Sequence, residues 1–573
     1  MARNKGQVRR SQLITTYGVG SVVAIEDESF MVAGLDRWPV DGPDLHEPRL
    51  ERMLRVSGFV LPPATEAGND VPVVRFPKKA YCPSCHLLAD HRFFTGTFNN
   101  VCSRCGVRLI PSRFVVCCAN GHIDDFPYFE WVHAGRTLQK DDKHDLQIES
   151  GGNTASLRSI EIKCSCGAER SMEGAFSRNA LRGVKRCTRR RPWLGRDDER
   201  TCDDTPRTLQ RGASNVWFSV TRSAISIPPW SELAFKLLNR HWRTLQHLHD
   251  DTALSGVIEG MKLAEGTPYS VQDLVFAVRR RQEASSDDRE DSYDAIRSEE
   301  YEALCRGFEE NSKDQDFVCV QVAGQRPTVS RWFDLVMQVK RLREVRALCT
   351  FSRVNPPAGL VNADSPPLYD EDPGWLPGVE VIGEGIFLRL SDALTDWESR
   401  PSVLERAARI DDNYRRRCDR YGVPTDRAIT PRFIAIHTLA HALIAQWSLD
   451  AGYPASSLRE RLYVSPDMAG LLIYTATSDS AGSLGGVIAQ AEPEALEDAL
   501  ITAIETASWC SSDPLCLEAD AAGVDSLNLA ACHAGSLLPE VSCEEMNLYL
   551  DRAMLVGAPD RPEVGLFREI IDR

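Results

Sequence analysis

The sequence predicts a multidomain α+β protein, with β-rich modules at the N-terminus, a mainly helical region, and an α/β domain at the C-terminus. Three observations lead to this prediction. Residues 12–38 alternate and are rich in β-branched side chains, and closely spaced cysteines follow them. Residues 231–248 and 332–348 carry apolar side chains at helical spacing. A helix, a strand, a glycine-rich turn, a second helix and a cysteine cluster then follow one another from 431 to 557.

The composition is that of a globular protein without a membrane span. Hydrophobic residues make up 43% of the 573 residues, yet no apolar run approaches the roughly 20 residues that cross a bilayer. The first residues lack the apolar core of a signal peptide, so we expect a cytoplasmic protein. In a reducing compartment, the 18 cysteines are more often metal ligands than disulfides. The net charge of -15 requires any DNA contact to come from a local basic patch or a basic partner.

Four cysteines near the N-terminus form the strongest chemical pattern in the chain. They make two C-x2-C pairs that are separated by sixteen residues: Cys82 with Cys85, and Cys102 with Cys105. Two such turns allow four thiolates to meet around one Zn2+ ion. Because protein ligands would fill all four positions, the pattern indicates a structural zinc site rather than a catalytic one.

A second set of cysteines has looser spacing and predicts a second zinc site. Its members are Cys164, Cys166, Cys187 and Cys202. Cys118 and His122 form another possible metal pair that could share this site, and the spacing alone leaves the ligand assignment open. The neighbouring Asp124 and Asp125 could be catalytic carboxylates. We favour a strand, a turn at Asn120–Gly121 and capping of the next element by Asp124, because no base or nucleophile lies nearby in sequence.

The densest basic run extends from Lys185 to Arg196 and includes one tryptophan. Basic side chains beside an aromatic ring suit phosphate contact and base stacking, so the run predicts a nucleic-acid contact. The residues concerned are Arg186, Arg189, Arg190, Arg191 and Trp193. A solvated loop is the alternative interpretation.

The segments between these motifs predict regular elements. We expect strands over 12–25, 30–38 and 379–390, with a turn at Gly18–Gly20. Helices are expected over 231–248 and, by their apolar spacing, over 332–348, where Arg341, Arg343 and Arg346 would form a solvated face. Together with composition changes, these elements divide the chain into a β-rich module, cysteine-rich zinc-ribbon-like modules, a mainly helical region and a C-terminal domain: 1–75, 76–215, 216–360 and 361–573.

The C-terminal domain begins with a predicted buried helix that places His437 and His441 one turn apart on one face. A buried strand over 470–476 and a glycine-rich loop over 478–486 follow. The histidines have zincin spacing but lack its glutamate base, which favours a buried hydrogen-bonding pair or a role in shaping the glycine loop. Four further cysteines follow: Cys510, Cys516, Cys532 and Cys543.

Ordered motifs run along nearly the whole chain. They include VRRSQLITTYGVGS (8–21), RFVVCCANGHIDDFP (113–127), QRGASNVWF (210–218), HTLAHALI (437–444), YTATSDSAGSLGG (474–486) and ACHAGSLLPEVSCE (531–544). In these motifs the chain resembles the DrmB family, the helicase-associated component of the bacterial DISARM antiphage defence system. Its C-terminal part is similar to the zinc-binding domain of MrfA-type helicases.

The resemblance implies a non-motor subunit that pairs with a superfamily 2 helicase, DrmA, and acts with it on phage DNA, without a catalytic site of its own. The absence of a G-x-x-x-x-G-K-[ST] motif agrees with this expectation. In MrfA-type domains a cysteine quartet holds the metal, and the four C-terminal cysteines lie at matching positions. The family pattern has C-x2-C at 532–535, whereas this chain has Gly535, which leaves Cys543 as the fourth ligand.

Two other functions compete with this one. The first is a hydrolase or nuclease in which His437, His441 and Asp479 form the active centre. The second is a stand-alone zinc-ribbon protein that binds single-stranded nucleic acid through the basic run, although the net acidity of the chain opposes binding without a partner.

Overall fold

The structure is a computed structural model that combines helices with largely antiparallel sheets, which confirms the predicted α+β class. No helix among the residues it describes is both long enough and apolar enough to cross a membrane. The described residues are 6–64, 70–94, 100–134, 144–150, 156–286, 292–309, 316–357, 365–475 and 485–572.

The chain divides into two compact units, neither of which is continuous in sequence. Unit 1 consists of three segments: Met1–Leu45, Val56–Arg222 and Arg346–Val379. Unit 2 consists of the segments between and after them: His46–Arg55, Ser223–Val345 and Glu380–Arg573. Three of the points at which the chain passes from one unit to the other fall inside long strands. These strands are β16 (Phe218–Ile225), β18 (Phe333–Ser352) and β19 (Leu376–Leu390).

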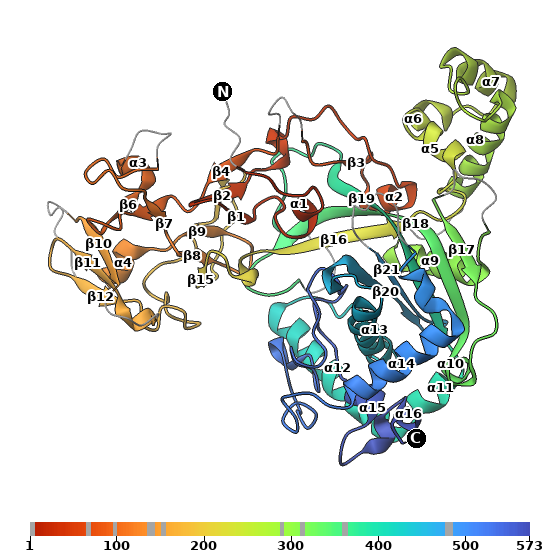
Figure 1. The fold of residues 1–573 in the computed structure, drawn as a ribbon. Coiled ribbons are helices and arrows are strands. Elements are labelled where there is room, and N and C mark those ends of the chain that lie inside the picture. The colour runs from red at the N-terminus through yellow and green to blue at the C-terminus, as the bar shows by residue number, and fades with distance from the viewer. Residues whose placement is uncertain are drawn as a thin grey trace. The chain divides into compact units, whose positions relative to one another are not determined.

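Unit 1 is built from short strands in small sheets (Figure 1). The first sheet has the order β1-β2-β4: Val22–Ile25, Glu28–Val32 and Val73–Arg75. The largest has the order β12-β11-β10-β6-β5-β7: Glu169–Ser171, Ile160–Cys164, Leu146–Ser150, Leu87–Asp90, Lys79–Tyr81 and Ile110–Pro111. The others are β15-β8-β9 and β13-β14: Arg207–Gln210, Phe114–Cys117, Ile123–Asp125, Arg190–Arg191 and Arg196–Asp197. Short helices accompany these strands: α1 (Gln12–Thr15), α3 (His91–Phe94) and α4 (Tyr128–Val132).

The predicted strand over 12–25 is only partly correct. Its first residues form the single helical turn α1, which buries Leu13 and Ile14, and the Thr15 hydroxyl donates to the Ser11 carbonyl at 3.1 Å. The predicted turn follows it, since Gly20 has a φ of +79°, and only then does β1 begin. The β-branched composition of this segment therefore did not determine its secondary structure, because burial of two adjacent apolar side chains also suits one helical turn.

The main sheet has the strand order β16-β18-β19-β21-β20. Its last two strands, β20 (Leu458–Ser465) and β21 (Met468–Thr475), form an antiparallel hairpin that lies wholly in unit 2. Short β17 (Val318–Gln321) pairs with β18, and β3 (Phe59–Val60) pairs with β19. The strand predicted over 470–476 corresponds to β21, and the one predicted over 379–390 lies within β19.

The helix predicted over 332–348 is wrong, because this segment forms β18, a strand of twenty residues. Its side chains alternate between two cores, with Val336 in one and Leu335 and Met337 in the other. Apolar residues on both faces of a strand erase the alternation that would have identified it. Two of the three arginines expected on a solvated face, Arg343 and Arg346, are buried, and Arg341 is half-buried. Arg343 donates to Ser226 Oγ at 2.8 Å and to Glu380 at 2.8 Å.

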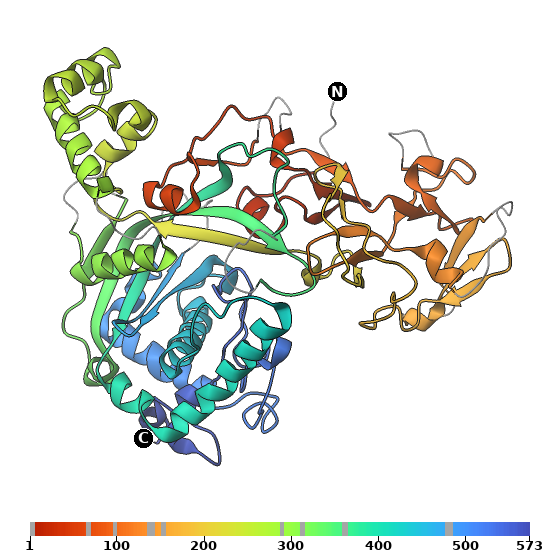
Figure 2. The same cartoon turned by 180° about the vertical axis from the view of Figure 1, so that it is seen from behind.

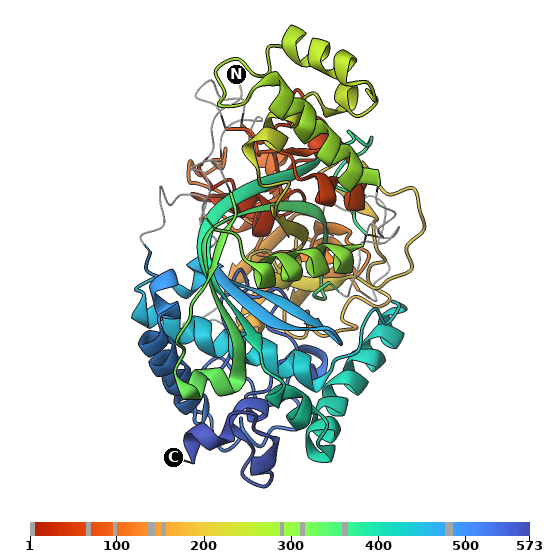
Figure 3. The ribbon, with the colours of Figure 1, turned by 90° about the vertical axis from the view of Figure 1, so that its right-hand side faces the viewer.

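Helices of unit 2 cover both faces of the β20–β21 hairpin (Figures 1 and 3). Leu471 and Ile473 belong to the core that contains helix α13 (Pro431–Asp450), whereas Leu472 and Tyr474 belong to the core that contains α9 (Tyr293–Arg306). The remaining helices of the α13 side include α10 (Pro327–Trp332), α11 (Ala393–Glu398), α12 (Pro401–Tyr421), α14 (Pro493–Ala507), α15 (Ala553–Val556) and α16 (Arg568–Ile571). Most residues of the hairpin are thus buried between two cores.

A group of helices follows β16 and appears together in Figure 2. Its members are α5 (Leu233–Asn239), α6 (Trp242–Leu245), α7 (Asp251–Gly260) and α8 (Val271–Ser286). The first two replace the single helix predicted over 231–248. Helix α2 (Pro48–Leu54) belongs to the same unit and contacts α9.

A buried ion pair joins α9 to β20. Arg461 binds Glu300 through two hydrogen bonds of 2.7 and 2.8 Å, and neither side chain is exposed. Arg461 also donates to Ser223 Oγ, and Tyr463 donates to Glu300 at 3.2 Å. Such a pair tolerates burial because its hydrogen-bonding capacity is filled.

Candidate metal centres

Side chains that can bind metal gather in five clusters within the described ranges. In each cluster the ligand atoms lie within 4.8 Å of one another. The clusters are I (Cys82, Cys85, Cys102, Cys105), II (Cys118, His122, Cys187, Cys202), III (His133, His144, Cys164, Cys166), IV (His437, His441, Glu460, Cys543) and V (Cys510, Cys516, Cys532). Clusters I to III belong to unit 1, and clusters IV and V belong to unit 2.

Cluster I unites the four cysteines of the two C-x2-C pairs, which form matched turns. In each turn the backbone N–H four residues after the first cysteine donates to the backbone carbonyl of that cysteine. His86 donates to Cys82 at 2.9 Å, and Gly106 donates to Cys102 at 2.8 Å. Both donors have positive φ, 60° and 69°. The Cys85 and Cys102 sulfurs are 4.0 Å apart, close to the ~3.8 Å that tetrahedral bonds of about 2.3 Å to zinc would give.

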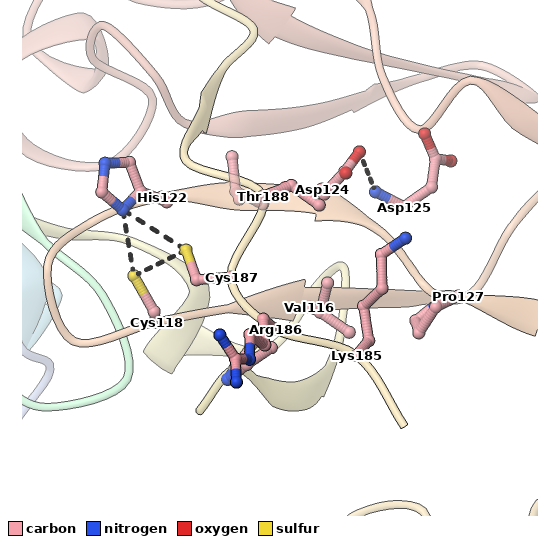
Figure 4. Close-up of a pocket in the computed structure, with 12 residues that line it drawn as sticks. Val116, Cys118, His122, Asp124, Asp125, Pro127, Lys185, Arg186, Cys187 and Thr188 are labelled. Atoms are coloured by element: carbon pink, nitrogen blue, oxygen red, sulfur yellow. Dashed lines mark hydrogen bonds between the residues drawn. The ribbon is translucent and has the colours of Figure 1, made fainter. Parts of the chain in front are cut away.

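Cluster II is assembled from turns far apart in sequence. The Cys118 sulfur lies 3.7 Å from that of Cys187 and 3.3 Å from His122 Nδ1 (Figure 4). It also lies 4.0 Å from the Cys202 sulfur. The other ring nitrogen of His122 lies 3.0 Å from Asp198, which is the carboxylate support often seen behind a metal-bound histidine. Burial would raise the pKa of Asp198, but hydrogen bonds from His122 and Arg200 outweigh it and lower that pKa to about 2.

Cluster III places two cysteines against two histidines. His133 Nε2 is 3.3 Å from the Cys166 sulfur, and His144 Nδ1 is 3.3 Å from the Cys164 sulfur. His133 Nδ1 donates to the Phe129 carbonyl at 2.8 Å, so its Nε2 keeps a free lone pair toward the cluster. A Cys2His2 set of this kind suits zinc.

Cluster V contains three of the four C-terminal cysteines. The Cys510 and Cys532 sulfurs are 3.7 Å apart, and Arg552 donates to the Cys510 sulfur at 3.3 Å. A Cβ placed on Gly535 would lie 3.2 Å from the Cβ of Cys510, so a cysteine there would stand beside the cluster. Glycine at this position leaves the cluster with three cysteines.

The grouping differs from the sequence prediction in two places. The set Cys164, Cys166, Cys187 and Cys202 is divided between clusters III and II, and Cys118 and His122 complete the latter. Cys543 lies in cluster IV rather than with the other C-terminal cysteines. Sequence reasoning missed three members altogether: His133, His144 and Glu460. The C-x-C pair at Cys164 and Cys166 lacks a second pair of cysteines nearby, which could have directed attention to the histidines that precede it in sequence.

The basic run is only partly available to a ligand. Trp193 is fully buried and its indole N–H donates to the Pro367 carbonyl at 2.9 Å, so no base can stack on it in this structure. Arg191 is buried and pairs with Asp198, which places it behind cluster II. Arg190 pairs with Asp124 at 3.3 Å, and the Arg189 guanidinium donates to backbone carbonyls. Arg186 is exposed.

Asp124 and Asp125 line a small pocket beside cluster II (Figure 4). Asp125 accepts the backbone N–H groups of Lys79 and Lys78 at 2.7 and 3.2 Å, which joins β9 to the start of β5. Desolvation raises the pKa of Asp125 to about 6. Asp124 accepts the N–H of Asp125 rather than capping α4, whose N-cap position is Pro127. Both carboxylates thus serve local structure.

The histidines of the suggested hydrolase centre are buried, with 0% exposure for His437 and 1% for His441. Asp479 and most of the glycine-rich loop lie outside the described residues.

Comparisons with known proteins find a matching family model at each end of the chain. Residues 9–218 match DUF8724, a domain of unknown function, and residues 439–534 match the MrfA Zn-binding domain. A curated relative, DISARM protein DrmB from Bacillus paralicheniformis, is 29% identical over 566 residues, which cover 95% of this chain and 99% of the relative. The match to a zinc-binding domain and the Cys/His donor sets together identify zinc as the cofactor.

Proposed function

Because the chain resembles a DISARM DrmB protein over nearly its full length, we propose that it is a non-motor subunit of an antiphage defence complex. In this complex it partners a superfamily 2 helicase of the DrmA type and assists its binding to, and action on, foreign DNA. The observation that carries the proposal is the coverage of the alignment, 95% of this chain and 99% of the relative. A match confined to the zinc-binding domain would have supported a much weaker statement.

The metal clusters support a scaffolding role. Clusters I, II and III each offer four protein ligands, which is the donor number of a structural zinc site, whereas catalytic zinc keeps a position for water. Zinc at these clusters stabilises turns that short strands alone hold weakly. The proposed work of unit 1 is therefore to present a rigid surface.

Any contact with DNA must come from local positive charge, because the whole chain carries a net charge of -15. Among the five residues predicted to contact nucleic acid, Arg186 is the exposed one, and it lines the pocket beside cluster II. A contact of this kind would be made to phosphate and would be independent of sequence.

The test compares this chain alone with the chain mixed with a superfamily 2 helicase of the DrmA type. We expect the chain alone to hydrolyse no ATP and to bind DNA weakly, and the mixture to co-purify and to bind DNA more tightly. Failure to co-purify, or ATP hydrolysis by the chain alone, would overturn the proposal.

A pair of variants locates the DNA contact within that complex. Arg186→Ala should weaken DNA binding a few-fold and reduce the salt dependence of binding by about one phosphate contact. Lys262→Ala, which removes an exposed charge from the helical region, is the matched control and should leave binding unchanged. Equal effects of the two variants would assign the loss to net charge rather than to a site.

A further inference from the structure

Cluster IV brings together four side chains from three separate parts of unit 2. His437 and His441 project from one face of α13, Glu460 lies on β20, and Cys543 lies in the loop beyond cluster V. All four are buried, with exposures of 0%, 1%, 0% and 4% in that order. Burying two imidazoles, a carboxylate and a thiol in an apolar interior costs free energy unless other interactions compensate, because each group loses its hydration there.

We propose that His437, His441, Glu460 and Cys543 bind one zinc ion, at a centre separate from the cysteines of cluster V. His437 Nε2 is 3.2 Å from the Cys543 sulfur and 3.1 Å from Glu460 Oε1. His441 Nε2 is 3.6 Å from Glu460 Oε2. Tetrahedral zinc holds nitrogen and sulfur ligands about 3.5 Å apart, and nitrogen and oxygen ligands about 3.3 Å apart, so these separations fit one ion.

Three buried atoms of these residues have no hydrogen-bond partner in the described part of the chain: His437 Nδ1, His441 Nε2 and Glu460 Oε2. The last two lie 3.6 Å apart within the cluster. His441 Nδ1 donates to the Ser536 carbonyl at 2.7 Å, which directs the lone pair of Nε2 toward Glu460. Neither His441 Nε2 nor Glu460 Oε2 has a hydrogen-bond partner. A buried hydrogen-bonded pair, the simpler interpretation of these residues, would leave both atoms unsatisfied, whereas a zinc ion between them satisfies both.

The surroundings of Cys543 resemble those of a metal-bound thiolate. Its sulfur accepts the backbone N–H groups of Glu545 and Asn547 at 3.3 and 3.2 Å. The loop is fixed from both sides, because Ser542 accepts the N–H of Glu460 through its carbonyl at 3.1 Å and the N–H of Glu544 donates to Glu460 Oε1 at 3.1 Å. Backbone hydrogen bonds thus fix the positions of both the sulfur and the carboxylate in the cluster.

Charge balance also favours a divalent ion. A thiolate and a carboxylate contribute two negative charges, and Zn2+ neutralises both within the core. Four protein ligands leave no position for water, so the centre is structural. His437 and Cys543 both lie outside the segment that matches the MrfA Zn-binding domain, residues 439–534, so the match does not assign this centre.

The experiment counts zinc in the purified full-length chain and in matched variants by mass spectrometry. Cys543→Ser and Glu460→Gln should each lose about one equivalent of zinc relative to the unmodified chain. Cys418→Ala is the matched control, since Cys418 is a buried cysteine of the same unit outside every cluster, and it should lose none. The double variant Cys532→Ser, Cys543→Ser should lose about two equivalents if the centres are separate.

Two results would overturn the proposal. If folded Cys543→Ser and Glu460→Gln retain the full zinc content, no ion is bound by cluster IV. If the double variant loses no more zinc than Cys532→Ser alone, Cys543 is instead the fourth ligand of cluster V.

A measurement on the unmodified protein covers the case in which the variants do not fold. Anomalous diffraction recorded above and below the zinc absorption edge should show a peak between His437, His441, Glu460 and Cys543, and another at cluster V. A peak at cluster V without one at cluster IV would refute the proposal. This result does not depend on helicase binding, so it can fail or succeed independently of the proposed function.

Discussion

Units 1 and 2 differ in the length of the helices and strands, and in the size of the hydrophobic cores, that surround their metal-ligand side chains. Clusters I to III lie in turns between strands of two to five residues, beside small cores such as the one formed by Ala80, Cys82, Leu87, Phe94, Cys102 and Leu109. Cluster IV lies between a helix of twenty residues and a strand of eight, within the most extensive core of unit 2. Small cores contribute little stability, so metal is expected to hold unit 1 together, whereas the fold of unit 2 holds its metal ligands in place.

The largest expected effect is the loss of a ligand in unit 1. Cys118→Ser should release the zinc of cluster II and unfold the surrounding turns, because structural zinc contributes about 10–16 kcal/mol to small metal-dependent folds. Zinc content and amide hydrogen exchange of the segments around Cys118, Cys187 and Cys202 measure this outcome. Cys117→Ser is a close control, since Cys117 is equally buried, adjacent in sequence and outside the clusters. Equal loss of zinc in both variants would contradict the assignment.

The next largest expected effect is on the stability of unit 2, and it does not depend on a metal ion. Glu300→Gln removes the charge that pairs with buried Arg461 and should lower the free energy of unfolding of unit 2 by about 3–5 kcal/mol. Urea unfolding followed by intrinsic tryptophan fluorescence measures the change. Glu265→Gln breaks the Lys262–Glu265 pair, whose side chains are 70% and 68% exposed, and should cost less than about 1 kcal/mol. Similar costs for the two variants would show that the buried pair does not stabilise unit 2.

A third variant tests whether a fourth cysteine gives cluster V the same number of ligands as the clusters of unit 1. Gly535→Cys adds a thiol beside Cys510 and should tighten zinc binding at cluster V by about 100-fold, since four ligands share roughly 10–16 kcal/mol in such sites. Competition with a chromogenic chelator measures the affinity. Gly535→Ser adds a side chain of similar size with a poor zinc ligand, and is expected to leave the affinity near that of the unmodified chain. Weaker binding in the cysteine variant would show that the added Cβ displaces Cys510.

The smallest expected effect is on zinc affinity at cluster II, and it concerns Asp198, which is hydrogen-bonded to the metal ligand His122. Asp198→Asn keeps the hydrogen bond to His122 but removes the negative charge, and should weaken zinc binding at cluster II by about 10- to 100-fold while the fold persists. The same chelator competition detects it. Asp197→Asn, at the exposed neighbouring position, should have no effect. An effect confined to Asp197 would contradict the role given to Asp198.

Local patterns in the sequence predicted what local geometry determines. The two C-x2-C pairs specify cluster I because each turn brings its own two sulfurs together, and only one further contact is needed. The buried helix that carries His437 and His441 and the strand over 470–476 were also predicted, because both have continuous apolar patterns bounded by turn residues.

Features that depend on tertiary structure could not be predicted in the same way. Cys118 and Cys202 meet across 84 residues, so spacing could not show that they share a cluster. Glu460 gave no signal at all, because a single glutamate in a strand is common. Strand β18 was misread as a helix because both of its faces are buried, and its apolar residues then fit helical spacing as well as they fit a strand.

The interleaving of the two units in sequence constrains how the chain folds during its synthesis. Unit 1 lacks its last segment until Val379 has emerged from the ribosome. By then the first two segments of unit 2 have been synthesised, but its last segment, Glu380–Arg573, has not. Neither unit can therefore finish before the other has begun, and contacts between segments so distant in sequence slow folding. A premature stop between Val345 and Val379 would leave both units incomplete, so truncated products of this chain should be targets for chaperones and proteases rather than stable fragments.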